Sequence, residues 1–140
     1  MRIYDNLFGF ETTIWAMAVT YDSKFLFVCG CSDYILNDND VVKCTLKQID
    51  IHSQKVIHDY EETDQNIGLM ATTRDNRYLF TFTEKGHIKQ WDIKEQTLYK
   101  DHGKAHKKRI QSIVITDDNR YLFTVDMRGG FKQWDIENAK

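Results

Sequence analysis

Short apolar runs separated by polar turns recur along the whole chain. A clear example begins at Asp75, where the polar turn DNR is followed by the apolar run YLFT, by a turn that contains Gly86, and by a run that ends in WDI at Ile93. The turns are rich in Asp, Asn and Gly, the residues that tight hairpins favour. Helical periodicity is not sustained anywhere. The pattern therefore predicts an all-β fold built from short antiparallel strands.

The same pattern returns at an interval of 43 residues. Self-similarity at a fixed period of about 20–50 residues is typical of repeat architectures, in which each repeat is one supersecondary unit. We expect one domain over residues 1–140, with units at about 13–65, 66–109 and 110–140. The matching segments are DNRYLFT at Asp75–Thr81 and Asp118–Thr124, the weaker DSKFLFV at Asp22–Val28, KQWDI at Lys89–Ile93 and Lys132–Ile136, and KQIDI at Lys47–Ile51.

Composition agrees with a globular β protein and excludes several classes. The chain of 140 residues is 41% hydrophobic and 29% charged, and its 13% of aromatic residues favours strands. A formal net charge of −2 predicts neither a nucleic-acid partner nor a membrane partner. Three cysteines are an odd and small number, which indicates a reducing compartment. We find no signal peptide and no apolar run of spanning length, and we expect an intracellular, cytoplasmic location.

The repeats resemble WD repeats. The features that carry the resemblance are the Trp-Asp pair that closes the third strand, the period near 43, and His106 four residues before the first strand of the third unit at Ile110. The resemblance covers roughly residues 14–140. It implies about three four-stranded antiparallel β-propeller blades and a non-enzymatic protein-interaction or scaffold module. In this interpretation the Trp packs between blades and the Asp closes the next turn.

Three departures from the family pattern stand out. The family places an Asp in the turn before the third strand, but Lys43, Lys85 and Arg128 stand there. The Gly-His pair of the family is reduced to Ala105-His106. We therefore expect the buried Asp–His–Ser–Trp hydrogen-bond network of the family to be missing. The first unit is irregular, because it carries about eleven extra residues within positions 31–43 and an Ile in place of its Trp.

A closed propeller has about four to eight blades, and this chain supplies three at most. The third unit stops four residues after Ile136, so we expect it to lack a fourth strand. The N-terminal segment Tyr4–Glu11 is a candidate outer strand. An open stack exposes apolar faces and strand edges, which favour association. We expect a homo-oligomer or completion by another propeller chain. The alternative function is therefore that of a structural subunit, which completes a propeller in one of these ways and binds no separate ligand.

The candidate binding surface is a basic rim. In the family, the turn between second and third strands and the loop before each first strand open on the same face. Lys104–Arg109, of sequence KAHKKR, is the most basic stretch of the chain. Such a rim attracts acidic or phosphorylated protein segments, and the alternative is a set of solvated turn residues. The predicted rim residues are Lys43, Lys85, His106, Lys107, Lys108, Arg109 and Arg128.

Other chemistry finds little support. The acidic stretch at Asp38–Asp40 lacks the spacing of a calcium loop, and Cys29, Cys31 and Cys44 match no zinc pattern, so buried structural thiols are the better interpretation. We find no nucleophile elbow, no phosphate-binding glycine loop, no catalytic residue and no cofactor site. An enzyme remains a rival only through a site shared with another chain.

Overall fold

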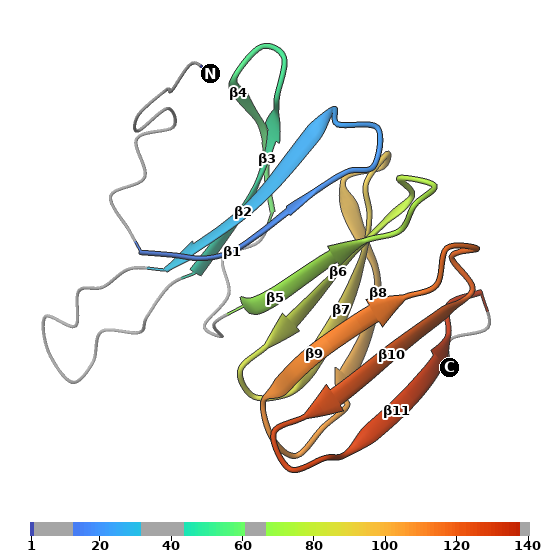
Figure 1. The fold of residues 1–140 in the computed structure, drawn as a ribbon. Helices are drawn as coiled ribbons and strands as arrows, with labels where there is room; N and C mark the ends of the chain where they lie inside the picture. The colour runs from blue at the N-terminus through green and yellow to red at the C-terminus, as the bar shows by residue number, and fades with distance from the viewer. Residues whose placement is uncertain (2–12, 32–43, 61–66, 138–140) are drawn as a thin grey trace, which may run out of the picture.

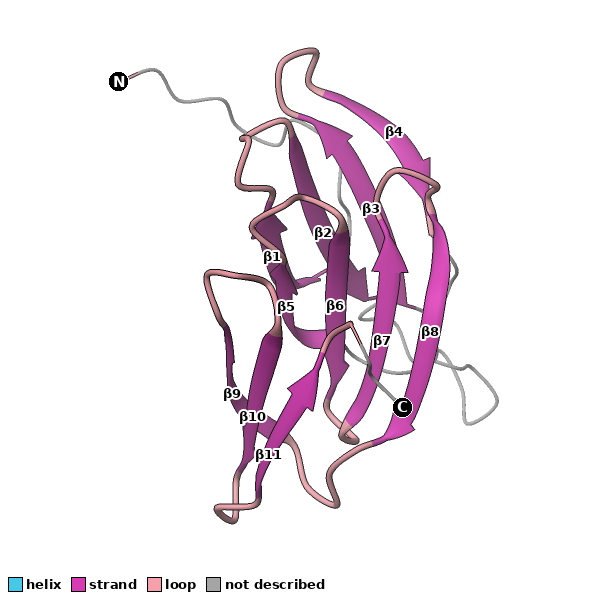
Figure 2. Ribbon diagram, turned by 90° about the vertical axis from the view of Figure 1, so that its right-hand side faces the viewer, coloured by secondary structure: helices cyan, strands magenta, loops and turns pink. Residues whose placement is uncertain are grey.

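The structure, a computed structural model, describes Met1 and residues 13–31, 44–60 and 67–137. These residues form three antiparallel sheets in chain order, and no helix occurs among them (Figure 1). Figure 2 shows the sheets as separate layers that stand side by side. The predicted all-β fold of blade-like units in an open array is confirmed.

We name the sheets blade 1, blade 2 and blade 3 in chain order. Blade 1 contains β1 (Thr13–Val19), β2 (Phe25–Cys31), β3 (Cys44–Asp50) and β4 (Lys55–Asp59). Blade 2 contains β5 (Ile67–Thr72), β6 (Tyr78–Thr83), β7 (His87–Asp92) and β8 (Thr97–Lys104). Blade 3 contains β9 (Ile110–Ile115), β10 (Tyr121–Asp126) and β11 (Phe131–Asp135), so it has three strands within the described residues. The segment Tyr4–Glu11, predicted as an outer strand, lies outside the described residues.

The turn between the first and second strands is the same in each blade. A Thr hydroxyl bonds the carboxylate two residues later, as Thr20 does with Asp22 at 2.6 Å and Thr116 does with Asp118 at 2.6 Å. The next residue has a left-handed backbone, with φ of 62° at Asn119. Asn tolerates this conformation better than most residues do. The DNR pattern therefore specifies the turn that joins these strands.

The two layers of core lie between neighbouring blades. Trp91 is 5% exposed and packs with Phe27 and Leu46 between blades 1 and 2. Leu122 and the partly buried Trp134 pack between blades 2 and 3. The prediction that the motif Trp packs between blades is confirmed. The motif Asp also closes the next turn as predicted, because the Asp carboxylate accepts a backbone N–H two or three residues later in each blade.

One polar pair repeats between the third and fourth strands. The Tyr60 hydroxyl donates to Gln48 Oε1 at 2.8 Å in blade 1, and His102 Nε2 lies 3.0 Å from Gln90 Oε1 in blade 2. Each pair spans twelve residues along the chain. Burial lowers the pKa of His102, because desolvation disfavours the imidazolium. These pairs tie β8, and the residue that directly follows β4, to the buried strands beside them.

The prediction of three buried thiols holds at Cys29 and is wrong at Cys44. Cys29 is a buried free thiol whose pKa is raised to about 11 by desolvation. Cys44 is disulfide-bonded, which contradicts the reducing compartment that the cysteine count indicated. The backbone pairing places Cys31 and Cys44 opposite each other on β2 and β3. The sequence hides this pairing, because the irregular segment between the two strands gives no hint of their register.

Candidate functional site

The predicted rim centres on blade 3. A depression of about 420 Å³ lies between the loop that leads into β9 and the turn between β10 and β11. Exposed cationic side chains surround it, and a single aromatic ring stands at its edge. The residues that line the depression are Ala105, His106, Lys107, Lys108, Asp126, Arg128, Gly130, Phe131 and Lys132.

The structure brings some predicted rim residues together and separates others. Lys107, Lys108 and Arg128 are exposed and line the same depression. Lys85 is exposed in the turn between β6 and β7, next to this loop, because Ala105 N donates to Gly86 O at 2.8 Å.

Arg109 lies away from the depression. The guanidinium of Arg109 lies beside Gly68 at the start of β5, where a Cβ added to that glycine would sit 3.6 Å from Nη2. Arg109 is therefore directed away from the depression. Lys43 lies outside the described residues.

Lys132 is a site residue that the sequence analysis missed. Its Nζ donates to the carbonyl oxygen of Ala105, and the same ammonium lies 5.8 Å from the centre of the Trp134 ring. Phe131, beside it, is 67% exposed. Both residues belong to the repeated third strand, which the sequence indicated only as structure. The depression thus combines one hydrogen-bonded ammonium and several exposed cationic side chains with an exposed aromatic ring.

The prediction that His106 is a binding residue of the rim is wrong. The residue is 4% exposed, so its ring does not offer itself to a partner on the rim. Nδ1 lies 3.1 Å from Asp126 Oδ2, and Nε2 lies 2.6 Å from Thr124 Oγ1. Trp134 Nε1 donates to the same Thr124 oxygen at 3.1 Å. The expected loss of the buried Asp–His–Ser–Trp network is therefore wrong for blade 3, where Thr124 takes the place of the serine.

The sequence analysis missed this network because it expected the acid at the wrong position. Asp126 ends β10 and stands two residues before Arg128, the position at which the family pattern led us to expect the Asp. The bonding pattern is satisfied when Nδ1 of His106 carries the proton and donates to Asp126, which leaves Nε2 to accept from Thr124. The spacing of His106, Thr124, Asp126 and Trp134 was the available signal.

Asp126 connects the buried network to the rim. Its Oδ1 accepts the backbone N–H groups of Arg128 and Gly130, each at 2.8 Å. These bonds, together with the His106 contact, lower the pKa of the Asp126 carboxyl, and the Gly130 bond is the largest cause. The carboxylate therefore stays ionised and fixes the backbone of the turn that carries Arg128.

The other blades carry less of this network. In blade 2, Trp91 Nε1 donates to Thr81 Oγ1 at 3.0 Å, while Thr83 stands where blade 3 has its aspartate. Blade 1 has Val28 and Ile49 at the positions of the threonine and the tryptophan. The network thus weakens toward the first blade, and the fully connected version supports the basic rim.

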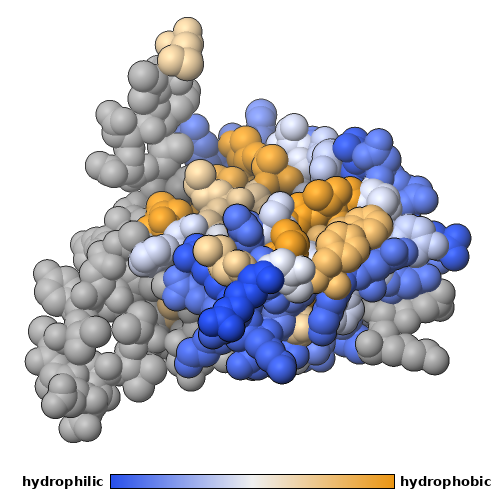
Figure 3. Space-filling view, turned by 60° about the horizontal axis from the view of Figure 1, so that its bottom comes forward, coloured by the Kyte–Doolittle hydropathy of each residue, from blue (hydrophilic) through white to orange (hydrophobic). Residues whose placement is uncertain are grey.

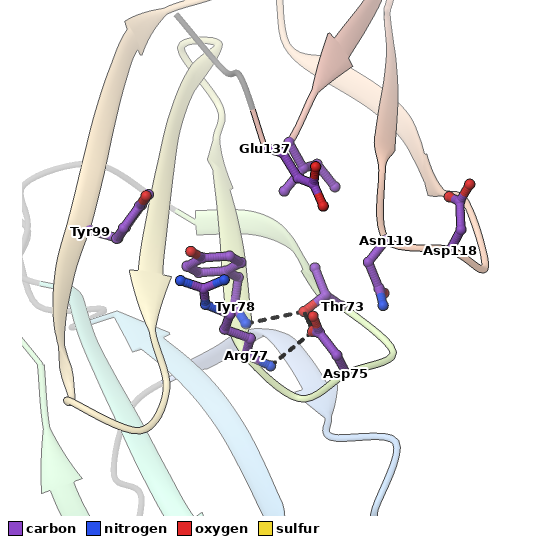
Figure 4. Close-up of a pocket in the computed structure, with 9 residues that line it drawn as sticks. Thr73, Asp75, Arg77, Tyr78, Tyr99, Asp118, Asn119 and Glu137 are labelled. Atoms are coloured by element: carbon purple, nitrogen blue, oxygen red, sulfur yellow. Dashed lines mark hydrogen bonds between the residues drawn. The ribbon is translucent and has the colours of Figure 1, made fainter.

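A second depression of about 310 Å³ lies at the opposite ends of the strands, between blades 2 and 3 (Figure 4). Two of its acidic side chains, those of Asp75 and Asp118, bond to the backbone of turns. Asp75 Oδ1 accepts Arg77 N at 3.1 Å, and Asp118 Oδ1 accepts Arg120 N at 3.0 Å. The Arg77 guanidinium lies over the Tyr78 ring at 4.7 Å. Because these groups hold the turns closed, this depression is a poorer candidate than the rim.

Two kinds of feature are absent from the described residues. In those ranges no three His, Cys, Asp or Glu side chains gather in a way that would hold a metal ion. The same part of the chain contains no apolar helix of membrane-spanning length.

Comparison with known proteins supports the blade interpretation. The WD repeat domain-containing protein 83 homolog of Dictyostelium discoideum is 31% identical over 71 residues, which are 51% of this chain and 22% of that protein. The solved structure of U3-55K superposes with a TM-score of 0.77 at 16% identity and covers 95% of this chain and 39% of that one. No family model matches the chain.

The resemblance to WD repeats is confirmed by the curated relative, and the structural neighbour shows the fold of β-propeller blades. The chain spans about a fifth of the length of its curated relative and about two fifths of its structural neighbour.

Proposed function

We propose that this chain is a non-enzymatic, intracellular protein-interaction module, and that its rim on blade 3 binds an acidic or phosphorylated protein segment. One observation carries the proposal. Lys107, Lys108 and Arg128 converge on one depression, and the turn that carries Arg128 is fixed by a buried carboxylate. Preorganised cations bind carboxylates and phosphates through charge-assisted hydrogen bonds at a lower entropic cost.

The chemistry of the depression suggests what the segment contains. Arg128 presents the planar fork that suits a phosphate or a carboxylate, while the two lysines act as point charges. Phe131 adds an exposed ring for an apolar or aromatic neighbour of the acidic group. We therefore expect the preferred ligand to be an extended peptide with an acidic or phosphorylated residue next to a hydrophobic one.

Charge reversal tests this surface. We expect a variant with Lys107→Glu, Lys108→Glu and Arg128→Glu to bind a fluorescein-labelled phosphopeptide at least about tenfold more weakly, because one charge-assisted hydrogen bond contributes about 1.4 kcal/mol or more. Fluorescence anisotropy measures the affinity. Wild-type affinity should also fall as salt is raised, because exposed charges are screened.

A matched control reverses three lysines at the other ends of the strands. Lys24, Lys55 and Lys94 are exposed and lie in or next to turns away from the rim. The control variant has the same net charge as the rim variant, so an equal loss of affinity in both would reduce the effect to net charge. Equal binding of phosphorylated and uncharged peptides by the wild type would contradict the proposal.

A structural role is the second candidate. In it, the blades complete a propeller with a second copy or with another chain. Apolar side chains that are exposed on the two outermost blades favour this role, since such surfaces usually mark an interface. The two roles share Phe131, which lines the depression and also belongs to the apolar face of blade 3, and otherwise use different side chains.

A further inference from the structure

Each junction between blades joins two different faces. We call the face that a blade turns toward the next blade its forward face, and the opposite one its back face. The forward face of blade 1 contributes Phe27 and Leu46, and the back face of blade 2 contributes Met70 and Leu79. Blades 2 and 3 meet in the same way, through Phe80 and its neighbours on one side and Leu122 and its neighbours on the other.

The forward face of blade 3 has the same composition but no cover among the described residues. Phe131 is 67% exposed, whereas Ile88 and Leu46, which occupy its position in blades 2 and 1, are each 1% exposed. Val114 is 59% exposed on the same face. The rings of Phe123 and Phe131 stack at 5.9 Å and extend the apolar area. Figure 3 brings the lower side of Figure 1 forward and shows hydrophobic groups open to solvent there.

The back face of blade 1 is open along β1. Ile14 is 44% exposed and Met17 is 61% exposed. Their equivalents in blade 2, Ile67 and Met70, are only 3% and 9% exposed because they pack against blade 1. Farther from β1 the same face is already buried, as Val28 at 2% shows, so the open part is a strip along the first strand.

We propose that a second copy of this chain docks head to tail, with the forward face of blade 3 of one copy against the β1 strip of blade 1 of the other. This inference rests on the structural candidate above and names its partner. The interface is heterologous, and two copies with three blades each supply six blades, which lies within the range of about four to eight for closed propellers.

The existing junctions define the register of the proposed one. Ala18 of blade 1 packs in the cluster that holds Met70 of blade 2. At the new junction Val114 takes the position of Ala18, and Met17 takes that of Met70. A larger residue on one side therefore faces a flexible one on the other, and Met side chains fill irregular gaps well.

The hydrogen bonds between the turns of neighbouring blades could also form at the proposed junction. Asn76 Oδ1 accepts Asp22 N of the preceding blade at 3.2 Å, and Asn119 Oδ1 accepts Arg74 N in the same way. At the proposed junction the equivalent position on blade 1 is Ser23, which has the same left-handed backbone with φ of 61°. A serine hydroxyl also accepts hydrogen bonds, so Ser23 can take the role that Asn has in the other two blades.

Complementary variants test the head-to-tail geometry. Val114→Glu spoils the forward face of blade 3, and Met17→Glu spoils the back face of blade 1, while neither residue lines the basic depression. Both side chains are mostly exposed in one copy, so the fold of each chain should survive, which circular dichroism checks. Leu98→Glu on β8 of the middle blade, at 38% exposure, is the control.

We expect light scattering after size exclusion to give two chains for the wild type and for the Leu98 control, and one chain for either single variant alone. An equimolar mixture of Val114→Glu and Met17→Glu should recover a two-chain species, because one intact junction remains. A wild type of one chain, a mass that the variants leave unchanged, or a mixture that stays at one chain would overturn the proposal. Phosphopeptide binding by the single variants is measured separately. It distinguishes failure of the head-to-tail proposal from failure of the proposed binding function of the rim.

Discussion

The Thr124 hydroxyl lies at the centre of the buried network in blade 3. It accepts from Trp134 Nε1 and bonds Nε2 of His106, whose other nitrogen is held by Asp126. A hydroxyl suits this place because it accepts one hydrogen bond and donates another. The sequence predicted the Trp and its packing, since the motif repeats. It did not reveal the acid, because Asp126 is one of many aspartates and its partner lies twenty residues away.

Loss of this hydroxyl should destabilise the chain measurably. We expect Thr124→Val to lower the free energy of unfolding by about 1–3 kcal/mol, because two largely buried groups lose their partner while the shape of the side chain is retained. Urea denaturation followed by Trp fluorescence measures the change.

Thr81→Val in blade 2 is the matched comparison. Among the described residues, Thr81 loses the side-chain bond from Trp91, and we expect a smaller cost of about 1 kcal/mol. If the two variants lost the same stability, the connection through His106 and Asp126 would contribute nothing beyond the Trp bond.

For the rim residues, the sequence predicted the exposed charges but not which side chains are buried by packing. The charges of Lys107, Lys108 and Arg128 were readable because turn residues stay exposed in most folds. The burial of His106 was not readable, because a histidine in a basic run looks like its neighbours. Lys132 was hidden for the opposite reason, since its repeat position marked it as structural.

The turns between second and third strands show how one blade constrains the next. Gly86 in blade 2 and Gly129 in blade 3 occupy the same repeat position and have φ of 85° and 81°. A Cβ at Gly86 would lie 2.2 Å from the carbonyl oxygen of His106, whereas nothing lies within 4 Å of a Cβ at Gly129. The backbone conformation is shared, and the close approach is specific to the turn that the next blade covers.

Alanine at the two glycines should separate these effects. We expect Gly129→Ala to cost about 1 kcal/mol, from the left-handed backbone alone. Gly86→Ala should cost at least about 1 kcal/mol more, because the contact is with backbone that has to shift. Thermal and urea unfolding of both variants measure the difference. Equal losses of stability would mean that the backbone of the loop before β9 makes no steric contact with a side chain at position 86.

Strand pattern and turn chemistry were predictable because they are local. Alternation of side chains, the DNR turns and the KQWDI strands give the type and order of most elements. The fourth strands were less visible, because β8 is largely exposed and carries mixed polar residues. Their attachment depends on pairs such as Gln48 with Tyr60 and Gln90 with His102, which no short motif announces.

At the level of the molecule, repetition predicts the faces as well as the blades. Each junction uses the same two kinds of face, so the open forward face of blade 3 and the open β1 strip of blade 1 are of complementary kinds. The sequence showed that three units leave an open stack. Only the comparison of exposure at equivalent residues, such as Phe131 with Ile88, identified which surfaces are open.

The absolute mass of the wild-type chain in solution tests this interpretation most directly. One chain weighs 16.6 kDa. Light scattering at several protein concentrations should give twice that mass, because each copy covers the open faces of the other. A folded species that keeps the mass of one chain at every concentration would contradict head-to-tail docking of the blades.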